Sequence, residues 1–278
     1  MKRILLLALL LPALIAHAEQ KKLFIVHTSD THSCVEPISP NFSDTLQANK
    51  GGYIRRAALL KDIRSEYPDN TLLLDCGDFS QGSAYYNLFK GEVEVKLMNE
   101  MGYDACTIGN HEFDSGLENM ARLFRMARFP VVCCNYDFTG TPVEGLVKPY
   151  IIIVRAGVRV GIFGVAPQLE GLVASQTYGA TTYTPPIKAA QPIADLLRNE
   201  EHCDIVICLS HLGWGDEEDH DKGFIRGTTG IDVVLGGHSH TYFEHPEYIL
   251  NKEGHEVVVN HMGKNARFLG TMELTIEK

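Results

Sequence analysis

Short apolar runs of strand length alternate with helix-like segments through the first half of this chain, and this alternation limits the folds that it can adopt. Residues 23–28 and 71–75 have the length and composition of buried strands, and residues 52–67 between them are expected to form a helix that Pro68 ends. A second helical spacing is marked by four apolar residues, Leu117, Met120, Ala121 and Phe124. The pattern favours an α/β fold.

The second half of the chain is richer in predicted strands. Residues 150–155 and 158–165 flank Ala156-Gly157, which indicates a β-hairpin. Further strands are expected at residues 104–108, 129–134, 204–209 and 231–235, and a helix is marked by Ala190, Ile193, Ala194 and Leu197. The C-terminal segments are expected to form a strand meander over residues 247–250, 256–260 and 268–277. We therefore predict two packed sheets with helices outside, in one domain that covers residues 19–278.

The first 18 residues have the composition of a secretory signal peptide. Lys2 and Arg3 precede an apolar run, and Ala16-His17-Ala18 has the small-x-small pattern of a cleavage site. The apolar run is shorter than the roughly 20 residues that a membrane-spanning helix needs. We therefore expect residues 1–18 to be removed on export to the periplasm or the medium, with no stable membrane insertion afterwards. A membrane-anchored N-terminus is the alternative.

The chain is acidic, which bears on its partners. Its formal net charge is −10, and removal of residues 1–18, which contain Lys2 and Arg3 but no acidic residue, makes it −12. A nucleic-acid polymer is therefore not an expected partner, because proteins that bind one usually carry a basic face.

The cysteines are expected to be buried thiols rather than disulfides. Their number, seven, is odd. Four of them lie in apolar strand-like runs, where cysteine behaves as a small hydrophobic residue: Cys76, Cys106, Cys133 and Cys208.

Five clusters of polar residues each follow a predicted strand. In chain order they are Asp30-Thr31-His32, Gly77-Asp78, Gly109-Asn110-His111-Glu112, Ser210-His211 and Gly236-Gly237-His238-Ser239-His240. Loops after the carboxyl ends of strands are where α/β sheets place their ligands. Each cluster alone fits an ordinary turn, but five clusters at equivalent positions indicate one shared site.

The residue types in these clusters are those that bind metal ions. They offer two Asp, four His and one Asn, more than the about three protein ligands of a single catalytic zinc site. They suit two ions if one carboxylate bridges, and mixed imidazole and carboxylate ligands favour Zn, Mn, Fe or Co over Ca or Mg. In an extended chain Asp30 and His32 would point to one side, and so would His238 and His240.

In this order the clusters resemble the motifs of the calcineurin-like metallophosphoesterases. The segments His27-Thr28-Ser29-Asp30-Thr31-His32 and Gly109-Asn110-His111-Glu112-Phe113-Asp114 are similar in particular to the N-terminal catalytic domain of bacterial periplasmic and animal 5′-nucleotidases. The resemblance covers essentially all of the chain after residue 18. It implies an α/β fold of the four-layer α/β/β/α sandwich type, with two packed mixed sheets flanked by helices.

The resemblance also implies a role for each donor. One ion would be held by Asp30, His32, Asp78 and His240, and the second by the bridging Asp78 with Asn110, His211 and His238. Two divalent ions and two carboxylates leave a local charge of about +2, which attracts phosphate to an acidic chain. The ions would lower the pKa of a bound water, and the resulting hydroxide would attack phosphorus.

Asn110 and His111 are adjacent and would face opposite ways in an extended chain, so that one can bind metal while the other reaches substrate. Both are therefore candidate substrate-binding residues. In the family, the imidazole at the position of His111 stabilises the transition state, and an Asp three residues later, here Asp114, orients it. The alternative for Asp114 is a cap on a helix that starts near Ser115.

The other histidines of the chain carry no motif. His27 is expected to pack in the first strand or to support the site from behind. The rest are expected at the surface: His202, His220, His245, His255 and His261.

The chain departs from the 5′-nucleotidase pattern at Ser33, where many relatives have glycine, and in its C-terminal part. In the two-domain enzymes a C-terminal domain supplies base-stacking aromatic residues and arginines for phosphate, and this sequence ends at Lys278 without them. We expect a nucleotide phosphomonoesterase assisted by a separately encoded C-terminal domain. The alternatives are a phosphodiesterase of 2′,3′-cyclic nucleotides or UDP-sugars, a phosphatase of small metabolites, and a metal-binding subunit that is inactive without its partner.

Overall fold

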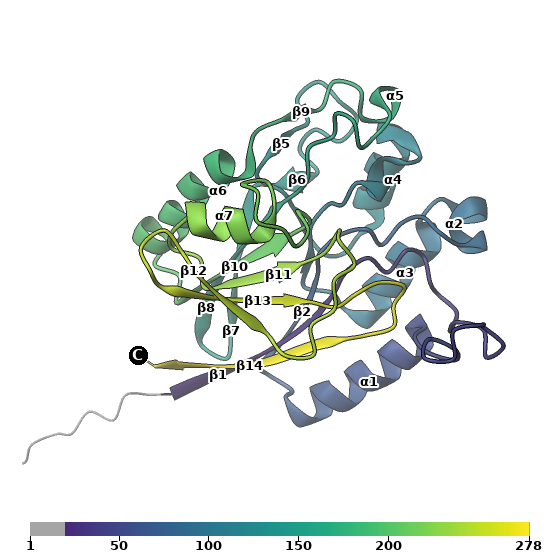
Figure 1. The fold of residues 1–278 in the computed structure, drawn as a ribbon, viewed down its shortest axis with the longest axis horizontal. Coiled ribbons are helices and arrows are strands. Elements are labelled where there is room, and N and C mark those ends of the chain that lie inside the picture. Colours follow the sequence, from purple (N-terminus) through teal and green to yellow (C-terminus); the bar gives the residue numbers. More distant parts are fainter. Residues whose placement is uncertain (1–19, 278) are drawn as a thin grey trace, which may run out of the picture.

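The computed structural model describes residues 20–277, so the predicted signal peptide over residues 1–18 lies outside the described residues. Two six-stranded sheets pack face to face, and helices lie on the outer side of each (Figure 1). The predicted α/β fold with two mixed sheets flanked by helices is therefore confirmed.

The first sheet has the strand order β14-β1-β2-β3-β4-β6. Its strands are β1 (Gln20–Thr28), β2 (Thr71–Asp75), β3 (Ala105–Cys106), β4 (Val131–Val132), β6 (Val147–Lys148) and β14 (Gly270–Glu277). All neighbours pair in parallel except β14, which is antiparallel to β1. The carboxyl ends of β1, β2 and β3 consequently meet at one edge of this sheet.

The second sheet has the strand order β12-β13-β11-β10-β8-β7. Its strands are β7 (Tyr150–Arg155), β8 (Val158–Val165), β10 (Ile205–Ser210), β11 (Val233–Gly236), β12 (Glu247–Leu250) and β13 (Glu256–His261). The four central strands are parallel, and the edge strands β7 and β12 are antiparallel to their neighbours. A small third sheet pairs β5 (Tyr136–Asp137) with β9 (Thr182–Tyr183).

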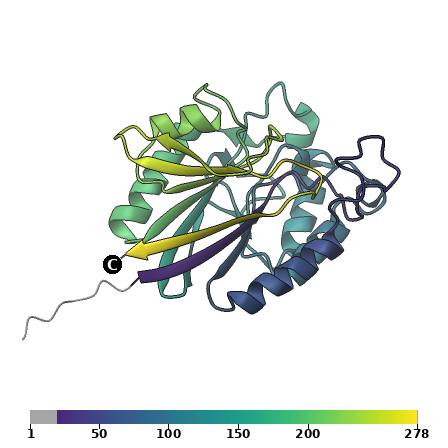
Figure 2. The same ribbon diagram turned by 60° about the horizontal axis from the view of Figure 1, so that its bottom comes forward.

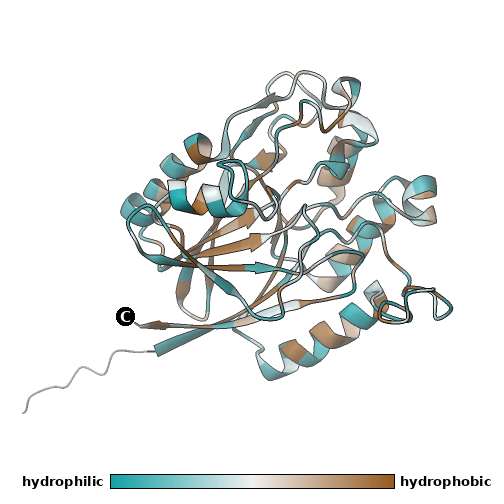
Figure 3. Ribbon diagram, viewed as in Figure 1, coloured by the Kyte–Doolittle hydropathy of each residue, from teal (hydrophilic) through white to brown (hydrophobic). Residues whose placement is uncertain are grey.

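The helices of the described residues complete the outer layers. They are α1 (Tyr53–Glu66), α2 (Ala84–Phe89), α3 (Glu92–Met101), the 3₁₀-helix η1 (His111–Phe113), α4 (Gly116–Met126), α5 (Ser175–Tyr178), α6 (Pro186–Asp195), the π-helix η2 (Leu196–Glu200) and α7 (Asp221–Gly227). Figure 3 shows hydrophobic residues gathered along the inner strands, whereas hydrophilic residues cover much of α7. Within residues 20–277, no helix has the length and apolar character needed to cross a bilayer.

Alternation along β1 shows how the layers are held together. Leu23 and Ile25 face the second sheet and pack with Ile162 and Leu235 in the core between the sheets. Val26, on the opposite face of β1, belongs to the core beneath α1, α3 and α4. A third core, which includes Phe163 and Phe224, lies between the second sheet and the helices α6 and α7. Three apolar layers therefore fix four layers of secondary structure.

The predicted C-terminal meander is wrong in its last strand. β12 and β13 form the expected antiparallel pair, but β14 crosses to the first sheet and pairs with β1, as Figure 2 shows. The chain makes this crossing through Gly263, Asn265 and Ala266, all of which have positive φ angles. On the first sheet, Met272 joins the core between the sheets, where its side chain is buried.

Two predicted strands are much shorter than expected. The segments 104–108 and 129–134 contain only the two-residue strands β3 and β4. The predicted helices at 52–67 and around residues 117–124 correspond to α1 and α4. All seven cysteines are free thiols, as predicted, and five of them are buried.

Candidate metal centre

The seven predicted metal donors lie where strands of both sheets end. Asp30 and His32 follow β1, Asp78 follows β2, and Asn110 follows β3 in the first sheet; His211 follows β10, and His238 and His240 follow β11 in the second. Six of these seven residues, all except Asn110, form three groups together with His111, and the ligand atoms in each group lie within 4.8 Å of one another. The groups are Asp30–His32–His240, His32–Asp78–His111 and Asp78–His211–His238. Because His32 and Asp78 each belong to two groups, the three form one continuous cluster.

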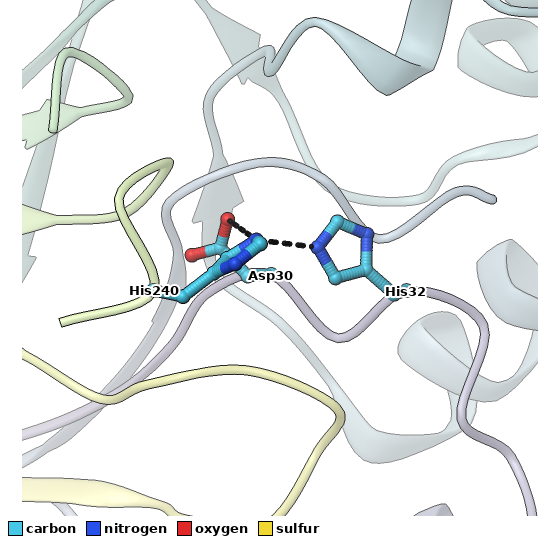
Figure 4. Close-up of side chains that lie close together, drawn as sticks. All are labelled: Asp30, His32 and His240. Atoms are coloured by element: carbon cyan, nitrogen blue, oxygen red, sulfur yellow. Dashed lines mark hydrogen bonds and ion pairs between the residues drawn. The ribbon is translucent and has the colours of Figure 1, made fainter. Parts of the chain in front are cut away.

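The first group joins the two sheets directly (Figure 4). The Nε2 atoms of His32 and His240 are 3.0 Å apart, and His240 Nε2 lies 3.7 Å from Asp30 Oδ1. The other nitrogen of His32, Nδ1, is buried without a hydrogen-bond partner. Two imidazole nitrogens and a carboxylate oxygen thus converge on a small volume, as ligands of one ion do.

The third group contains the deeply buried pair His211 and Asp78. His211 Nε2 lies 3.0 Å from Asp78 Oδ2 and 3.9 Å from Asp30 Oδ1, and both carboxylates are fully or almost fully buried. The opposite ring nitrogen, His211 Nδ1, lies 2.6 Å from the carbonyl oxygen of Cys76, on the other sheet. That bond fixes the ring orientation and leaves Nε2 directed at the carboxylates.

The paired ligands do not lie in an extended chain, the condition under which each pair would point to one side. Asp30, His32, Asp78, His238 and His240 have φ angles of 47°, 44°, 55°, 69° and 57°, in the left-handed region that residues other than glycine rarely adopt. Backbone bonds between the loops hold this shape: Asp30 N–H donates to Gly77 O, and His32 N–H donates to Asp78 O. Local strain of this kind is found mostly at functional sites, where surrounding structure enforces it.

The Asn110–His111 segment is also not extended. Asn110 has helical angles (φ −74°, ψ −29°), and His111 begins the 3₁₀-helix η1. Asn110 Oδ1 is buried without a hydrogen-bond partner, whereas the half-buried His111 places Nδ1 2.9 Å from Asp114 Oδ2. The N-cap of α4 is Ser115, and no side chain caps that helix through a hydrogen bond. The contact that Asp114 makes is therefore with His111.

Burial disfavours the charged form of each group in the cluster, so it lowers the pKa of an imidazole and raises the pKa of a carboxyl group. Neighbouring opposite charges act against this effect. Burial lowers the pKa of His32 and of His238 to about 4, so these imidazoles are neutral near pH 7 and have a free lone pair. Burial raises the pKa of Asp30 to about 7. At Asp78 burial acts in the same direction, but the neighbouring His211 outweighs it and holds the pKa well below its usual value.

One supporting residue was not predicted with a definite role. Glu112 is buried, and its carboxylate accepts hydrogen bonds from the backbone N–H groups of Asp78, Ser80 and Gly109 at 2.7–3.1 Å. Burial raises the pKa of Glu112 to about 7. A Cβ atom on Gly109 would lie 2.1 Å from Asp78 Oδ1, so only glycine lets this loop approach the carboxylate. Neither fact is visible in the sequence, because both depend on contacts between loops.

The prediction for one histidine is wrong. His261 was expected at the surface, but its side chain is 1% exposed and its Nε2 lies 2.7 Å from Asp221 Oδ2. The sequence held a usable signal, since His261 ends β13 as the polar clusters end their strands. His27 is fully buried in β1, and burial lowers its pKa to about 3.

The donor set fits divalent metal ions. Two buried carboxylates 3–4 Å from one imidazole are costly to collect in a low-dielectric environment, and a cation offsets that cost. The unpartnered Asn110 Oδ1 adds an amide oxygen, and no thiolate lies in the three groups. An α/β/β/α sandwich with these donors at the joined strand ends defines the class of the protein as one with a candidate divalent-metal centre.

More narrowly, the chain belongs to the calcineurin-like phosphoesterase family, whose sequence profile matches residues 24–242. It is 32% identical to the 5′-nucleotidase of Bos taurus over 98% of this chain and 49% of that protein. A solved 5′-nucleotidase precursor from Thermus thermophilus is 33% identical, with a TM-score of 0.82 over 91% of this chain and 51% of that one. The NAD nucleotidase of Haemophilus influenzae is 26% identical, with a TM-score of 0.81 over 94% and 55%.

These relatives place the chain in a chemical class. Calcineurin-like phosphoesterases use divalent metals, and this chain is homologous to the N-terminal domain of 5′-nucleotidases. The chain spans about half the length of the curated relatives that it matches.

Proposed function

We propose that this protein hydrolyses 5′-nucleotides to nucleoside and phosphate at a binuclear metal centre. The observation that carries the proposal is the continuity of the three donor groups through His32 and Asp78, because overlapping groups suit two neighbouring ions. The proposed ligands are Asp30, His32, Asp78, Asn110, His211, His238 and His240, with Asp78 between the two ions. The ions would be Zn, Mn, Fe or Co.

When bound, two such ions neutralise phosphate oxygens and make water a stronger nucleophile near neutral pH. The chain's own contribution is to hold the donors in place and to leave one side open. Three members of the cluster, His111, His238 and His240, are partly exposed, and the side chains of His240 and His111 are 35% and 30% exposed. Substrate would therefore approach along the side that these three residues line.

His111 is the proposed acid that assists the leaving oxygen, and Asp114 orients it. Burial alone would lower the pKa of His111, but its hydrogen bond to Asp114 and the charges of Asp78 and Asp114 raise it. A raised pKa keeps more of the imidazole protonated near pH 7, so that it can donate to the developing alkoxide. Asn110 and His111 would both face the substrate, one beside the metal and one beside the leaving group.

Nucleotide selection is proposed to need a further polypeptide. The relatives are about twice as long as the matched region, which supports a separately encoded C-terminal domain as a partner. We further propose that residues 1–18 are an export signal and that residues 19–278 act in the periplasm or outside the cell.

The test is a substrate panel on protein purified from the full-length gene and loaded with Mn²⁺ or Zn²⁺. Phosphate release would be measured from 5′-AMP, UDP-glucose, a 2′,3′-cyclic nucleotide and p-nitrophenyl phosphate, beside Asp78→Asn and His111→Ala. AMP hydrolysis that both substitutions remove supports the proposal. The exposed Asp62 supplies a matched control, Asp62→Asn, which should retain full activity.

The same half-length match favours one second candidate, a metal-binding subunit that is inactive alone. Two ions bound per chain with no turnover on any substrate would support that role and contradict a self-sufficient nucleotidase. Preference for the cyclic nucleotide or for UDP-glucose would instead identify a phosphodiesterase, and turnover of p-nitrophenyl phosphate alone would identify a less selective phosphatase.

A further inference from the structure

Behind the second sheet's half of the cluster lies a buried network of three side chains. Ser210 Oγ donates to Asp221 Oδ1 at 2.5 Å, and Asp221 Oδ2 lies 2.7 Å from His261 Nε2. Ser210 and Asp221 are fully buried, and His261 is 1% exposed. None of the three belongs to the donor groups that form the candidate metal centre.

The order of the three groups excludes a nucleophilic triad. In a hydrolytic triad the imidazole stands between hydroxyl and carboxylate, and it removes the hydroxyl proton. Here the carboxylate of Asp221 stands between the other two, so the Ser210 hydroxyl bonds to that carboxylate and not to the imidazole. Complete burial also denies it access to substrate. The network is suited to holding chain segments together.

One end of the network fixes the turn that carries His211. Ser210 directly precedes His211, and its Oγ also accepts from Leu212 N–H at 3.2 Å. Asp221 N–H, at the start of α7, donates to Gly213 O at 2.9 Å. The backbone on both sides of His211 is therefore tied to Asp221.

The other end fixes the loop that carries His238 and His240. The ring of His261 lies against Gly236 so closely that a Cβ atom there would be 2.1 Å from His261 Nε2. Trp214 packs edge-on against the same ring, with centroids 5.7 Å apart, and the backbone N–H of Trp214 donates to Ser239 Oγ at 2.9 Å. Ser239 lies between His238 and His240 in the chain, so both histidines depend on this packing.

We propose that Asp221 and His261 are positioning residues for the metal centre, and that they hold the three imidazole donors of the second sheet in register with the carboxylates of the first. This inference rests on the proposed function. Residues that orient ligands from outside typically change metal affinity or activity by about 10–100-fold when replaced. The surface position expected from the sequence would predict no such effect.

The test compares His261→Ala with His261→Gln and with His245→Ala, a matched substitution of an exposed histidine. Mn²⁺ binding to the full chain would be measured by calorimetry, and the Mn²⁺ spectrum by electron paramagnetic resonance. His261→Ala should weaken Mn²⁺ binding by about 10–100-fold. His261→Gln should recover most of the affinity, because its amide can donate to Asp221, and His245→Ala should match the parent protein.

A folded His261→Ala protein that binds Mn²⁺ as tightly as the parent, with the same spectrum, overturns the inference. If His261→Ala does not fold, Ser210→Ala decides, because it removes only one hydroxyl from the network. Weakened Mn²⁺ binding in Ser210→Ala supports the inference, and unchanged binding overturns it. A parent protein that binds no Mn²⁺ or Zn²⁺ contradicts the proposed function itself, which is a different result.

Discussion

The two sheets contribute unlike chemistry to one cluster. The first sheet supplies both carboxylates, Asp30 and Asp78, together with Glu112 behind them, whereas the second sheet supplies His211, His238 and His240 and no acid. Bonds cross between the halves, since His238 N–H donates to Asp30 Oδ1 at 3.0 Å. The negative charge that attracts cations thus belongs to the first sheet, and the second sheet contributes imidazoles alone.

This division explains the uneven support behind the two halves. On the first sheet, buried acids are balanced by backbone N–H groups, as at Glu112. On the second sheet, imidazoles need orientation rather than charge, and the packed ring of His261 with Asp221 supplies it. Loss of charge and loss of orientation should therefore have different consequences, which the following experiments separate.

Loss of charge should have the largest effect. Asp78→Asn removes the carboxylate shared by two donor groups, and Lewis-acid assistance of several kcal/mol depends on the ions held there. The rate of p-nitrophenyl phosphate hydrolysis should fall by about 10³-fold, since each 1.36 kcal/mol is tenfold. Added Mn²⁺ should not restore it. An Asp78→Asn protein with more than a tenth of the parent rate would contradict a central role for this carboxylate.

Loss of His111, the proposed acid that assists the leaving group, should have the second-largest effect on activity. His111→Ala should lower kcat by about 10²-fold, the lower range for general acid catalysis, and should leave Mn²⁺ affinity nearly unchanged. Steady-state kinetics and calorimetry on the same preparation would measure both. A large fall in Mn²⁺ affinity would instead assign His111 to the metal ligands, where its place in the second donor group also allows it.

Loss of one imidazole donor from the second sheet should have a smaller effect on activity, and added metal should reverse it. Replacing a residue that only orients a ligand, such as His261, is expected to weaken Mn²⁺ binding by about 10–100-fold. His240→Asn removes a proposed ligand and should weaken binding by at least as much. Because the carboxylates remain, saturating Mn²⁺ should restore most of the activity, unlike in Asp78→Asn. Metal titration of the rate distinguishes the two. If His240→Asn and Asp78→Asn respond to added Mn²⁺ in the same way, the proposed difference between the two sheets is wrong.

The smallest expected effect is a displaced pH profile. Asp114 helps to raise the pKa of His111, so the protonated imidazole persists to higher pH in the parent than in Asp114→Asn. Activity that needs this proton is present below the pKa and is lost as the pH rises through it. The alkaline limb of kcat against pH should therefore move to lower pH in Asp114→Asn. An unmoved limb would show that another group controls it.

The sequence predicted the layers of sheets and helices and the polar residues that come together at the strand ends. It did not predict the contacts between loops that position those residues. Strand ends marked by Asp30, Asp78 and His211 are local signals, because turn and ligand residue types follow apolar runs directly. The left-handed backbone at His238 depends on bonds to another loop, and so does the burial of His261. The crossing of β14 likewise depends on an open edge beside β1 that no local pattern records.

The antiparallel pair β1–β14 has a practical consequence for engineering. Gln20 lies opposite Glu277, whereas His27 and Gly270 pair near the cluster, about 23 Å away at roughly 3.3 Å per residue. A short linker can therefore join residues 277 and 20 into a ring, and the chain can be reopened in the exposed loop around residues 41–48. Such a circular permutant, or an enzyme fixed to a solid support through either strand end, would keep the catalytic edge directed toward the solution.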